Sequence, residues 1–445
     1  MKKSLFAIAA VTAFAGAAQA QSSVTVYGIL DVGYIGQNSR IANNAATAGG
    51  TVAQQTNSQF GQSAQSTSRL GFKGNEDLGG GLSAFFTIET AITPNAQNAI
   101  QTNVSSSNRQ TFVGLKKHGV GQFALGTQYT TIHNAVAATD PGMQNNMQGN
   151  VIYDKPGFNT PVNGSALSGG TGTTTAGSVQ FSGQQDNTSY TVRANNMLSL
   201  QSDNFAGFQG NAFYVMNNQN ANQATVTSGT GTAATTAITG GTTNNNGFGL
   251  GVNYTWTKLL VTANYQQFTD KGLSTINGAG QYSAGNPIQG GFGGTTVYGQ
   301  NAKDNQQYYA ATYDFGILKG YLQYVNRKTL DVNNPNNYVA RTAQQIGVRS
   351  YITPTVESWA SFGTGKLTVS QAYSGTNALV VTTGTGSNAA NFGGFQLGTN
   401  YWLSKRTNLY AIYGQQRTSN QMFGANANQT SYNSNDYAVG VRHTF

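Results

Sequence analysis

The sequence predicts an all-β protein, a transmembrane antiparallel barrel of sixteen strands with short turns at one end and long loops at the other. The first observation is composition: 8% of the 445 residues are charged and 11% are aromatic, whereas ordinary soluble domains contain about 25% charged residues. The second is a two-residue alternation of apolar and polar side chains, which indicates strands. The third is that short and long connections follow one another along the chain.

Composition also excludes several other classes of protein. Disordered chains usually combine few aromatic residues with high net charge, and this chain contains 23 Tyr, 22 Phe and 3 Trp. Collagen is excluded because the chain has only 7 Pro and no Gly-X-Y period. After the first twenty residues, no segment approaches the ~18 consecutive apolar residues that a membrane-spanning helix needs. A β-rich class remains, in which polar and aromatic residues share the strands.

The N-terminus has the pattern of a secretory signal peptide. Lys2 and Lys3 precede an apolar stretch at 5–16, and Ala18-Gln19-Ala20 fits a cleavage site. We therefore expect a signal peptide at residues 1–20 and one exported barrel at residues 21–445. Exported proteins often depend on disulfides, but this chain has no Cys. A closed network of backbone hydrogen bonds would provide its stability.

Strand-like alternation is clearest in four segments, residues 24–34, 248–256, 309–315 and 437–445. One face of each segment is apolar or aromatic, and the other carries small or polar residues. A soluble β-sandwich would alternate in the same way, so alternation alone does not identify the surroundings of the strands.

The connections are more informative. Outer-membrane barrels have short periplasmic turns and long extracellular loops, and closure removes the unpaired edges of a sheet. Counting strands between the connections gives sixteen, with both termini at the periplasmic end. The short connections are expected at 78–81, 119–121, 257–258, 315–317, 354–355 and 404–406. The long ones are expected at 38–65, 93–107, 133–185, 219–246, 271–303, 329–340, 372–391 and 419–434, including low-complexity tracts at 163–178, 225–246 and 374–391 that are typical of solvated loops.

Short blocks spread over residues 22–445 share their order and pattern with one known family. The chain resembles the Gram-negative general diffusion porins, in particular the trimeric branch of the β-proteobacteria. The blocks are 22–31, Ser68-Arg69-Leu70-Gly71-Phe72-Lys73-Gly74, 76–82, 109–115, 125–129, 193–196, 205–208, 401–410 and Gly440-Val441-Arg442-His443-Thr444-Phe445.

The resemblance implies an outer-membrane, multi-pass barrel that forms a water-filled channel for passive diffusion of small hydrophilic solutes and ions. It also implies a homotrimer, contact with outer-membrane lipid and lipopolysaccharide, and insertion by the barrel-assembly machinery. The family's third loop folds into the lumen; here that loop is 133–185, and it carries only two acids, Asp140 and Asp154. No cofactor and no metal is expected.

Alternation assigns charged side chains to the lumen. A charge facing lipid near mid-bilayer costs ~2–4 kcal/mol, so strand cations should face water. The resemblance implies that arginines at these motifs gather at the narrowest point of the pore, where they would prefer anions; the alternative is that each only hydrates the rim. We place Leu70, Phe72, Phe112, Tyr190, Val192 and Ala194 outward, which turns Arg69, Lys73, Arg109 and Arg193 inward.

The acids allow two readings each. Glu89 has inward parity and would either orient the arginines by ion pairing or simply line the wall. Asp140 and Asp154 would either face the arginines or be solvated. The long-loop cations Arg40 and Lys303 are expected to lie away from the pore.

Two further sets of residues, at the C-terminal end and near the strand ends, are interpreted from their positions in the chain. The alternating C-terminal end resembles the signal read by the assembly machinery, with Tyr437, Val439, Val441, His443 and Phe445 on one face. Aromatic residues near strand ends are expected in interfacial belts, with barrel packing or a subunit interface as alternatives: Tyr254, Trp256, Tyr401, Trp402, Tyr413 and Tyr437.

Other functions have little support. His118, His133 and His443 are far apart and lie in no metal-binding or catalytic motif, so an enzyme is not expected. Nucleic acid is not an expected partner either, because no basic run exceeds two residues. A substrate-selective outer-membrane channel remains as an alternative to a general pore, followed by a surface adhesin or structural outer-membrane protein.

Overall fold

The computed structural model describes residues 23–44, 51–96, 108–154, 184–228, 235–272, 300–332, 335–336, 338–370, 388–421 and 429–445. The expected signal peptide and the tract 163–178 lie outside these residues. The elements are β1 Ser23–Asn44, β2 Thr51–Gln62, β3 Arg69–Gly79, β4 Leu82–Ala91, β5 Asn108–Lys117, β6 Gly121–Tyr129, α3 Thr131–Thr139, β7 Gln184–Asp186, β8 Thr191–Ser202, β9 Phe208–Ser228, β10 Thr235–Trp256, β11 Leu259–Gly272, β12 Gln300–Asp314, β13 Lys319–Asp331, β14 Tyr338–Tyr351, β15 Val356–Ser370, β16 Asn388–Trp402, β17 Thr407–Gln421 and β18 Gln429–Thr444.

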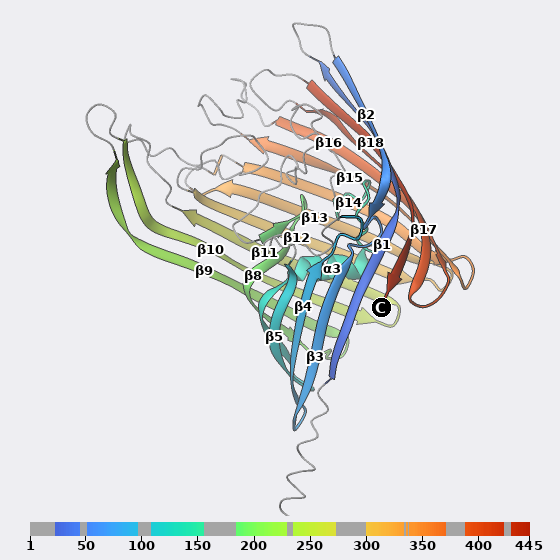
Figure 1. Cartoon of the computed structure of the whole chain (residues 1–445), viewed down its shortest axis with the longest axis horizontal. Helices are drawn as coiled ribbons and strands as arrows, with labels where there is room; N and C mark the ends of the chain where they lie inside the picture. Colours follow the sequence, from blue (N-terminus) through green and yellow to red (C-terminus); the bar gives the residue numbers. More distant parts are fainter. Residues whose placement is uncertain are drawn as a thin grey trace, which may run out of the picture.

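These strands form one closed antiparallel barrel (Figure 1). β1 pairs with β18 from Ile29↔Thr444 upward, which closes the sheet. β2 and β3 both pair with β1, at 32–43 and 23–29, and so share one position around the barrel. The three-residue β7 pairs only with the start of β8. The barrel therefore has sixteen strand positions, which confirms the prediction.

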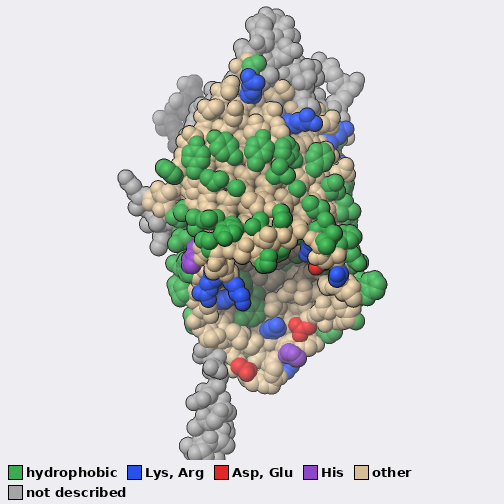
Figure 2. Space-filling view, turned by 90° about the vertical axis from the view of Figure 1, so that its right-hand side faces the viewer, with side chains coloured by type: hydrophobic (Ala, Val, Ile, Leu, Met, Phe, Trp, Pro, Cys, Tyr) green, Lys and Arg blue, Asp and Glu red, His purple; other side chains and the backbone are tan. Residues whose placement is uncertain are grey.

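The outer face of the barrel carries the apolar half of the alternation. In β1, Val24 and Val26 are 66% and 52% exposed, whereas Asp31 on the other face is fully buried. The last strand exposes Tyr437, Val439 and Val441 in the same way. Figure 2 shows hydrophobic side chains in a band across one side of the barrel, with Lys and Arg above and below it. This is the surface expected of a barrel embedded in lipid.

The short turns lie where the sequence predicts them, but several long connections are shorter than expected. β1 extends to Asn44 and β2 begins at Thr51, so most of the expected loop 38–65 is strand. β9 and β10 likewise extend into 219–246, including much of the tract 225–246. Arg40 and Lys303 consequently lie on β1 and β12 rather than in loops. Polar, low-complexity sequence can pair as strands here because neighbouring strands supply the backbone partners.

The segment that follows β6 lies inside the barrel (Figure 1). α3 begins after Thr130, whose side chain accepts a hydrogen bond from the backbone N–H of His133. Its apolar face, with Ile132 and Val136, packs against the lumen-facing Phe213 and Phe268 of the wall. Across the residues that the structure describes, no helix is long and apolar enough to cross a membrane.

Two face assignments made from the sequence are wrong. Val113 of β5 is 60% exposed, whereas Phe112 contacts the ring of Phe85 on the inner face. Tyr190, Val192 and Ala194 are buried, and they join the cluster that contains α3. The start of β8 lies inside the barrel, so simple in–out alternation does not apply there.

Candidate functional site

A basic cluster lies on one side of the lumen, where β3, β4 and β5 meet. Glu89 of β4 is its only carboxylate among the described residues, and its Oε1 lies 2.6 Å from Arg109 Nε and 3.7 Å from Arg69 Nη1. Tyr27 donates a hydrogen bond of 3.1 Å to Glu89 Oε2. Glu89 therefore forms ion pairs with both arginines, the contact that the first of its two readings requires.

Arg193 joins this cluster through Tyr129. Arg109 Nη2 donates a hydrogen bond of 2.6 Å to the Tyr129 hydroxyl, and the guanidinium of Arg193 lies 5.6 Å from the centre of the same ring. Arg193 also donates to the backbone oxygen of Asn108. No described carboxylate lies within ion-pair distance of Arg193. The cluster therefore contains three arginines and one glutamate, which leaves two positive charges in excess.

The inward position of Arg109 depends on a β-bulge. Glu89 pairs with Gln110 and Thr90 with Asn108, so Arg109 is an extra residue in β5. Because Phe112 faces inward, regular alternation would turn Arg109 toward lipid; the bulge restores it to the lumen. The inward assignment of Arg109 is correct, but the reason given by the sequence is not.

Lys73 lies beside the cluster rather than within it. It is an exposed residue of β3, and its Nζ lies 5.4 Å from the centre of the Tyr27 ring. It adds a positive charge near Tyr27 and has no direct contact with Glu89 among the described interactions.

The opposite wall carries a second set of arginines, on β13 and β14, and these are matched by acids. Arg327 Nη2 lies 2.7 Å from Asp304 and 3.4 Å from Asp186. Arg341 pairs with Asp154 at 2.8 Å, and Arg349 pairs with Glu357 at 2.6 Å. Three arginines here face four carboxylates.

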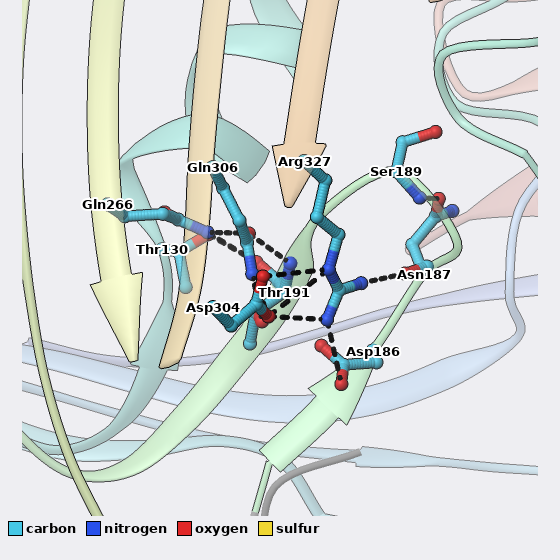
Figure 3. A network of polar contacts seen from close by, with 9 residues as sticks. All are labelled: Thr130, Asp186, Asn187, Ser189, Thr191, Gln266, Asp304, Gln306 and Arg327. Atoms are coloured by element: carbon cyan, nitrogen blue, oxygen red, sulfur yellow. Dashed lines mark hydrogen bonds and ion pairs between the residues drawn. The ribbon is translucent and has the colours of Figure 1, made fainter. Parts of the chain in front are cut away.

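Each of these arginines also holds a segment that lies in the lumen. Arg327 Nη1 donates to the backbone oxygen of Asn187, between β7 and β8. Arg341 donates to the backbone oxygen of Val151, and Arg349 to that of Pro141. Figure 3 shows Arg327 between Asp304 of the wall and Asp186 of β7. The second set fastens two segments that are inserted into the lumen, residues 131–154 and 184–190, to the wall.

The two loop acids do not reach the basic cluster. Asp154 pairs with Arg341. Asp140, which ends α3, accepts hydrogen bonds from the backbone N–H of Gln144 and the side chain of Asn150. Burial raises the pKa of Asp140, and these donated hydrogen bonds oppose the rise. Both acids stabilise the fold of the inserted segment.

Fully buried glutamines line the wall behind this segment, and no motif in the sequence marks them. Gln306 accepts from the backbone N–H of Thr191, Gln345 from that of Val151, and Gln396 donates to the backbone oxygens of Met147 and Gln148. Long amides can satisfy backbone groups of a loop that has no strand partner. Their only signal in the sequence is inward parity on successive strands: Gln266, Gln306, Gln323, Gln345 and Gln396.

Glycines on the same wall make room for the inserted backbone. A side chain at Gly394 would meet Gly149, and one at Gly414 would meet the backbone oxygen of Gln148. Likewise, Gly363 faces Val151 and Gly347 faces Pro141. These four glycines, on β14 to β17, allow the chain at 141–151 to lie directly against the sheet.

The remaining predicted residues lie on the outside or at the seam. The C-terminal set is exposed on β18, and Phe445 exchanges backbone hydrogen bonds with Gly28 of β1 at 3.1 and 3.2 Å. Most of the expected belt aromatics are outward; Trp256 is 62% exposed. Trp402 is the exception, because its indole N–H donates to the inward Glu357. No group of three or more metal-ligating side chains lies together within the described ranges.

A closed sixteen-strand barrel with an apolar outer face and a charged lumen defines a transmembrane β-barrel channel. Its sequence matches the profile of the Gram-negative porin family over residues 7–421. The chain belongs to that family, and it is an outer-membrane channel rather than an enzyme.

Relatives and solved structures agree with this assignment. The chain is 28% identical to an outer membrane porin protein of Bordetella pertussis over 469 aligned residues, covering 100% of both proteins. It is 32% identical to outer membrane porin protein 32 of Delftia acidovorans over 48% of this chain and 49% of that one. The fold resembles an anion-selective porin from Comamonas acidovorans, with a TM-score of 0.59, 20% identity and coverage of 95% and 100%. A trimer form of OmpT of Vibrio cholerae aligns with a TM-score of 0.51 and 15% identity, covering 95% and 99%.

Proposed function

We propose that the barrel is a general diffusion pore for small hydrophilic solutes and ions, and that it prefers anions. The observation that carries the preference is the excess of cations in the basic cluster, which contains Arg69, Arg109 and Arg193 but a single carboxylate. Fixed charge in a narrow, low-dielectric passage attracts ions of opposite sign. A solved relative in fold is described as an anion-selective porin, which supports the same direction.

The charge balance elsewhere in the lumen strengthens this proposal. On the opposite wall the arginines are matched by Asp304, Asp186, Asp154 and Glu357. That side therefore contributes little positive field of its own. Selectivity should originate at the basic cluster formed by Arg69, Arg109 and Arg193.

Planar-bilayer recording of the purified wild-type protein tests the proposal. We expect open channels and, in a potassium chloride gradient, a reversal potential of the sign given by chloride preference. A cation-selective pore would contradict the anion preference, and absence of conductance would contradict the pore itself. Block by one sugar or organic acid at low concentration would indicate the substrate-selective alternative.

We further propose a homotrimer whose contacts include Val24, Val26, Val439 and Val441. These residues are exposed on β1 and β18, on either side of the closing seam. A trimer form is among the structures of similar fold. Mild detergent should extract a species of about three times the mass of the 46.7 kDa full chain, less three signal peptides; a monomer in every mild detergent tested would contradict this.

We also propose that residues 1–20 direct export and that the end of β18 directs assembly. Phe445 closes the seam by its two backbone hydrogen bonds to Gly28, so its loss removes both pairing and a terminal aromatic side chain. Deleting Phe445 should sharply lower the amount of heat-modifiable barrel in the outer membrane, while the processed chain still reaches the periplasm. An unchanged amount of folded barrel would refute this role.

A further inference from the structure

Two aromatic side chains face the lumen but belong neither to the basic cluster nor to the contacts of the inserted segments. Phe85 of β4 and Phe112 of β5 are both partly exposed. Their ring centres lie 6.2 Å apart, and the rings meet edge to face at 76°. Within the described residues, neither is part of the buried apolar cluster that contains α3. We call these two residues the lumen aromatic patch.

The patch places apolar surface in a passage that is otherwise polar. The ring of Phe85 covers part of the wall, because a Cβ added at Gly114 would lie 2.6 Å from its Cζ. The remaining surface of that ring, like that of Phe112, faces the lumen. Apolar surface in contact with water is unfavourable, so a solute that covers these rings as it passes gains free energy.

The patch lies on the periplasmic side of the basic cluster. β4 and β5 run side by side here (Figure 1), and Glu89 pairs with Gln110. Toward the short turns, the next lumen-facing residues are Thr87 and Phe112, which pair with each other, and then Phe85. Two residues of strand, about 7 Å, separate Phe112 from the level of Glu89. A solute that touches the rings is therefore within reach of the arginines.

Exposed cations with inward parity lie around the patch. Lys73 of β3 is two strands away from Phe112 at the same level, and it is exposed. Lys116 of β5 lies on the turn side of the patch and is also exposed. Within the basic cluster, the side chain of Arg69 is 21% exposed, against 10% for Arg109. Arg69 and Lys73 are thus the cations that a solute in front of the patch can contact.

The acids nearby do not neutralise these cations. Glu89 is already paired with Arg69 and Arg109. In the described part of β3 to β5, the other acid of inward parity is Asp77, which lies at the turn and accepts the backbone N–H of Gly79 at 2.9 Å. The space in front of the patch therefore combines a net positive charge with two aromatic rings.

We propose that the lumen aromatic patch and the cations beside it form a binding subsite for small carboxylates that bear an aromatic ring. The inference rests on the anion-preferring pore proposed above and names a class of anion for it. The carboxylate binds Lys73 or Arg69, and the ring packs against Phe112 and Phe85 in the edge-to-face or offset geometry that aromatic pairs prefer. The Cα atoms of Lys73 and Phe112 are two strand spacings apart, about 10 Å, which a lysine side chain and one aromatic carboxylate span together.

Planar-bilayer recording of the complete processed protein tests the proposal, with benzoate, acetate and benzyl alcohol as probes. Benzoate should reduce the chloride current at a lower concentration than acetate, which lacks the ring, and than benzyl alcohol, which lacks the charge. In oriented insertions, benzoate should act at a lower concentration from the periplasmic side, because it reaches the patch before the arginines. Equal action of benzoate and acetate, or equal action from the two sides, would overturn the proposal.

The variant Phe85→Leu/Phe112→Leu removes both rings and leaves every charge in place. Its half-blocking concentration for benzoate should rise about threefold to tenfold, while its response to acetate and its chloride preference stay as in wild type. The matched control is Phe72→Leu on the outward face of β3, where Phe72 is 41% exposed; it should leave all three quantities unchanged. Unchanged benzoate block in a folded, conducting double variant would refute the subsite.

If the double variant does not assemble, Phe112→Leu alone takes its place with the same expected direction. Lys73→Gln should weaken the block by benzoate and by acetate alike, because it removes a charge and no ring. A wild-type pore without chloride preference would contradict the proposed function itself. A chloride-preferring pore that benzoate and acetate block equally would contradict only this subsite.

Discussion

Two groups of three arginines face each other across the lumen, and they differ in how many acids accompany them. Arg69, Arg109 and Arg193 are accompanied by a single carboxylate, Glu89, which pairs with the first two. Arg327, Arg341 and Arg349 face four carboxylates and donate to backbone oxygens of the inserted segments. The first group leaves an uncompensated positive field, whereas the second, with four carboxylates against three arginines, leaves no positive excess and holds the structure in place. The number of carboxylate partners, rather than the arginine itself, separates the two roles.

The largest effect is expected from breaking the second group. Arg327 is almost fully buried between Asp304 and Asp186. Removing one partner of a buried ion pair typically costs about 3–5 kcal/mol, and here two acids lose their partner. Arg327→Gln should lower the heat-modification midpoint strongly and release the turn between β7 and β8. The double change Arg327→Gln/Asp304→Asn should recover part of the loss; no destabilisation in the single variant would contradict the anchoring role.

An intermediate effect is expected from adding a side chain at one of the glycines of β14 to β17 that face the inserted segment. A methyl group at Gly394 would fall within 3.0 Å of the Gly149 backbone, so Gly394→Ala must displace the inserted segment. Gly393 is its neighbour on the opposite face, where the nearest atom would be 3.5 Å away. Gly394→Ala should change single-channel conductance and Gly393→Ala should not. Equal conductance in both variants would show that the segment is not held by this wall.

A smaller effect is expected within the first group. Glu89→Gln removes the only carboxylate of this group but keeps a side chain of similar shape, whose single amide oxygen can accept a hydrogen bond from either Arg109 or Tyr27 in the place of the corresponding carboxylate oxygen. The positive excess then increases by one charge, so the preference for chloride should rise modestly. A shift toward potassium, measured as reversal potential, would show that Glu89 contributes mainly by positioning the arginines.

The sequence pattern was sufficient for the barrel and its strand number, and the family resemblance pointed to the basic cluster. Period-two alternation and one-sided long loops follow directly from a sheet closed in lipid, and Arg69, Arg109, Arg193 and Glu89 do come together. The bulge at Arg109 could not be foreseen, because one extra residue depends on the register of two strands.

The inserted segment was the least predictable region. The residues around Tyr190 leave the wall and are buried on both faces, so the two-residue alternation of a wall strand does not describe them. Two of the acids that match Arg327 and Arg341, Asp186 and Asp154, come from elements distant in the chain, so their pairing requires the folded structure. The buried glutamines carry no motif, because an amide on a lumen-facing position looks like any polar pore residue.

The most direct test of the account is the reversal potential of Arg109→Gln/Arg193→Gln in a potassium chloride gradient. Two unit charges about 8 Å apart interact by about 2 kcal/mol at an effective dielectric constant of about 20, enough to change a permeability ratio severalfold. Screening acts over about 10 Å at 0.1 M salt, so cations on the outer face, such as Arg40 and Lys303, should have little influence. We predict that the double variant moves toward cation preference while its assembly is unchanged, and that Arg40→Gln/Lys303→Gln does not move. Equal shifts in the two double variants, or none in the first, would contradict the claim that the under-compensated arginines set selectivity.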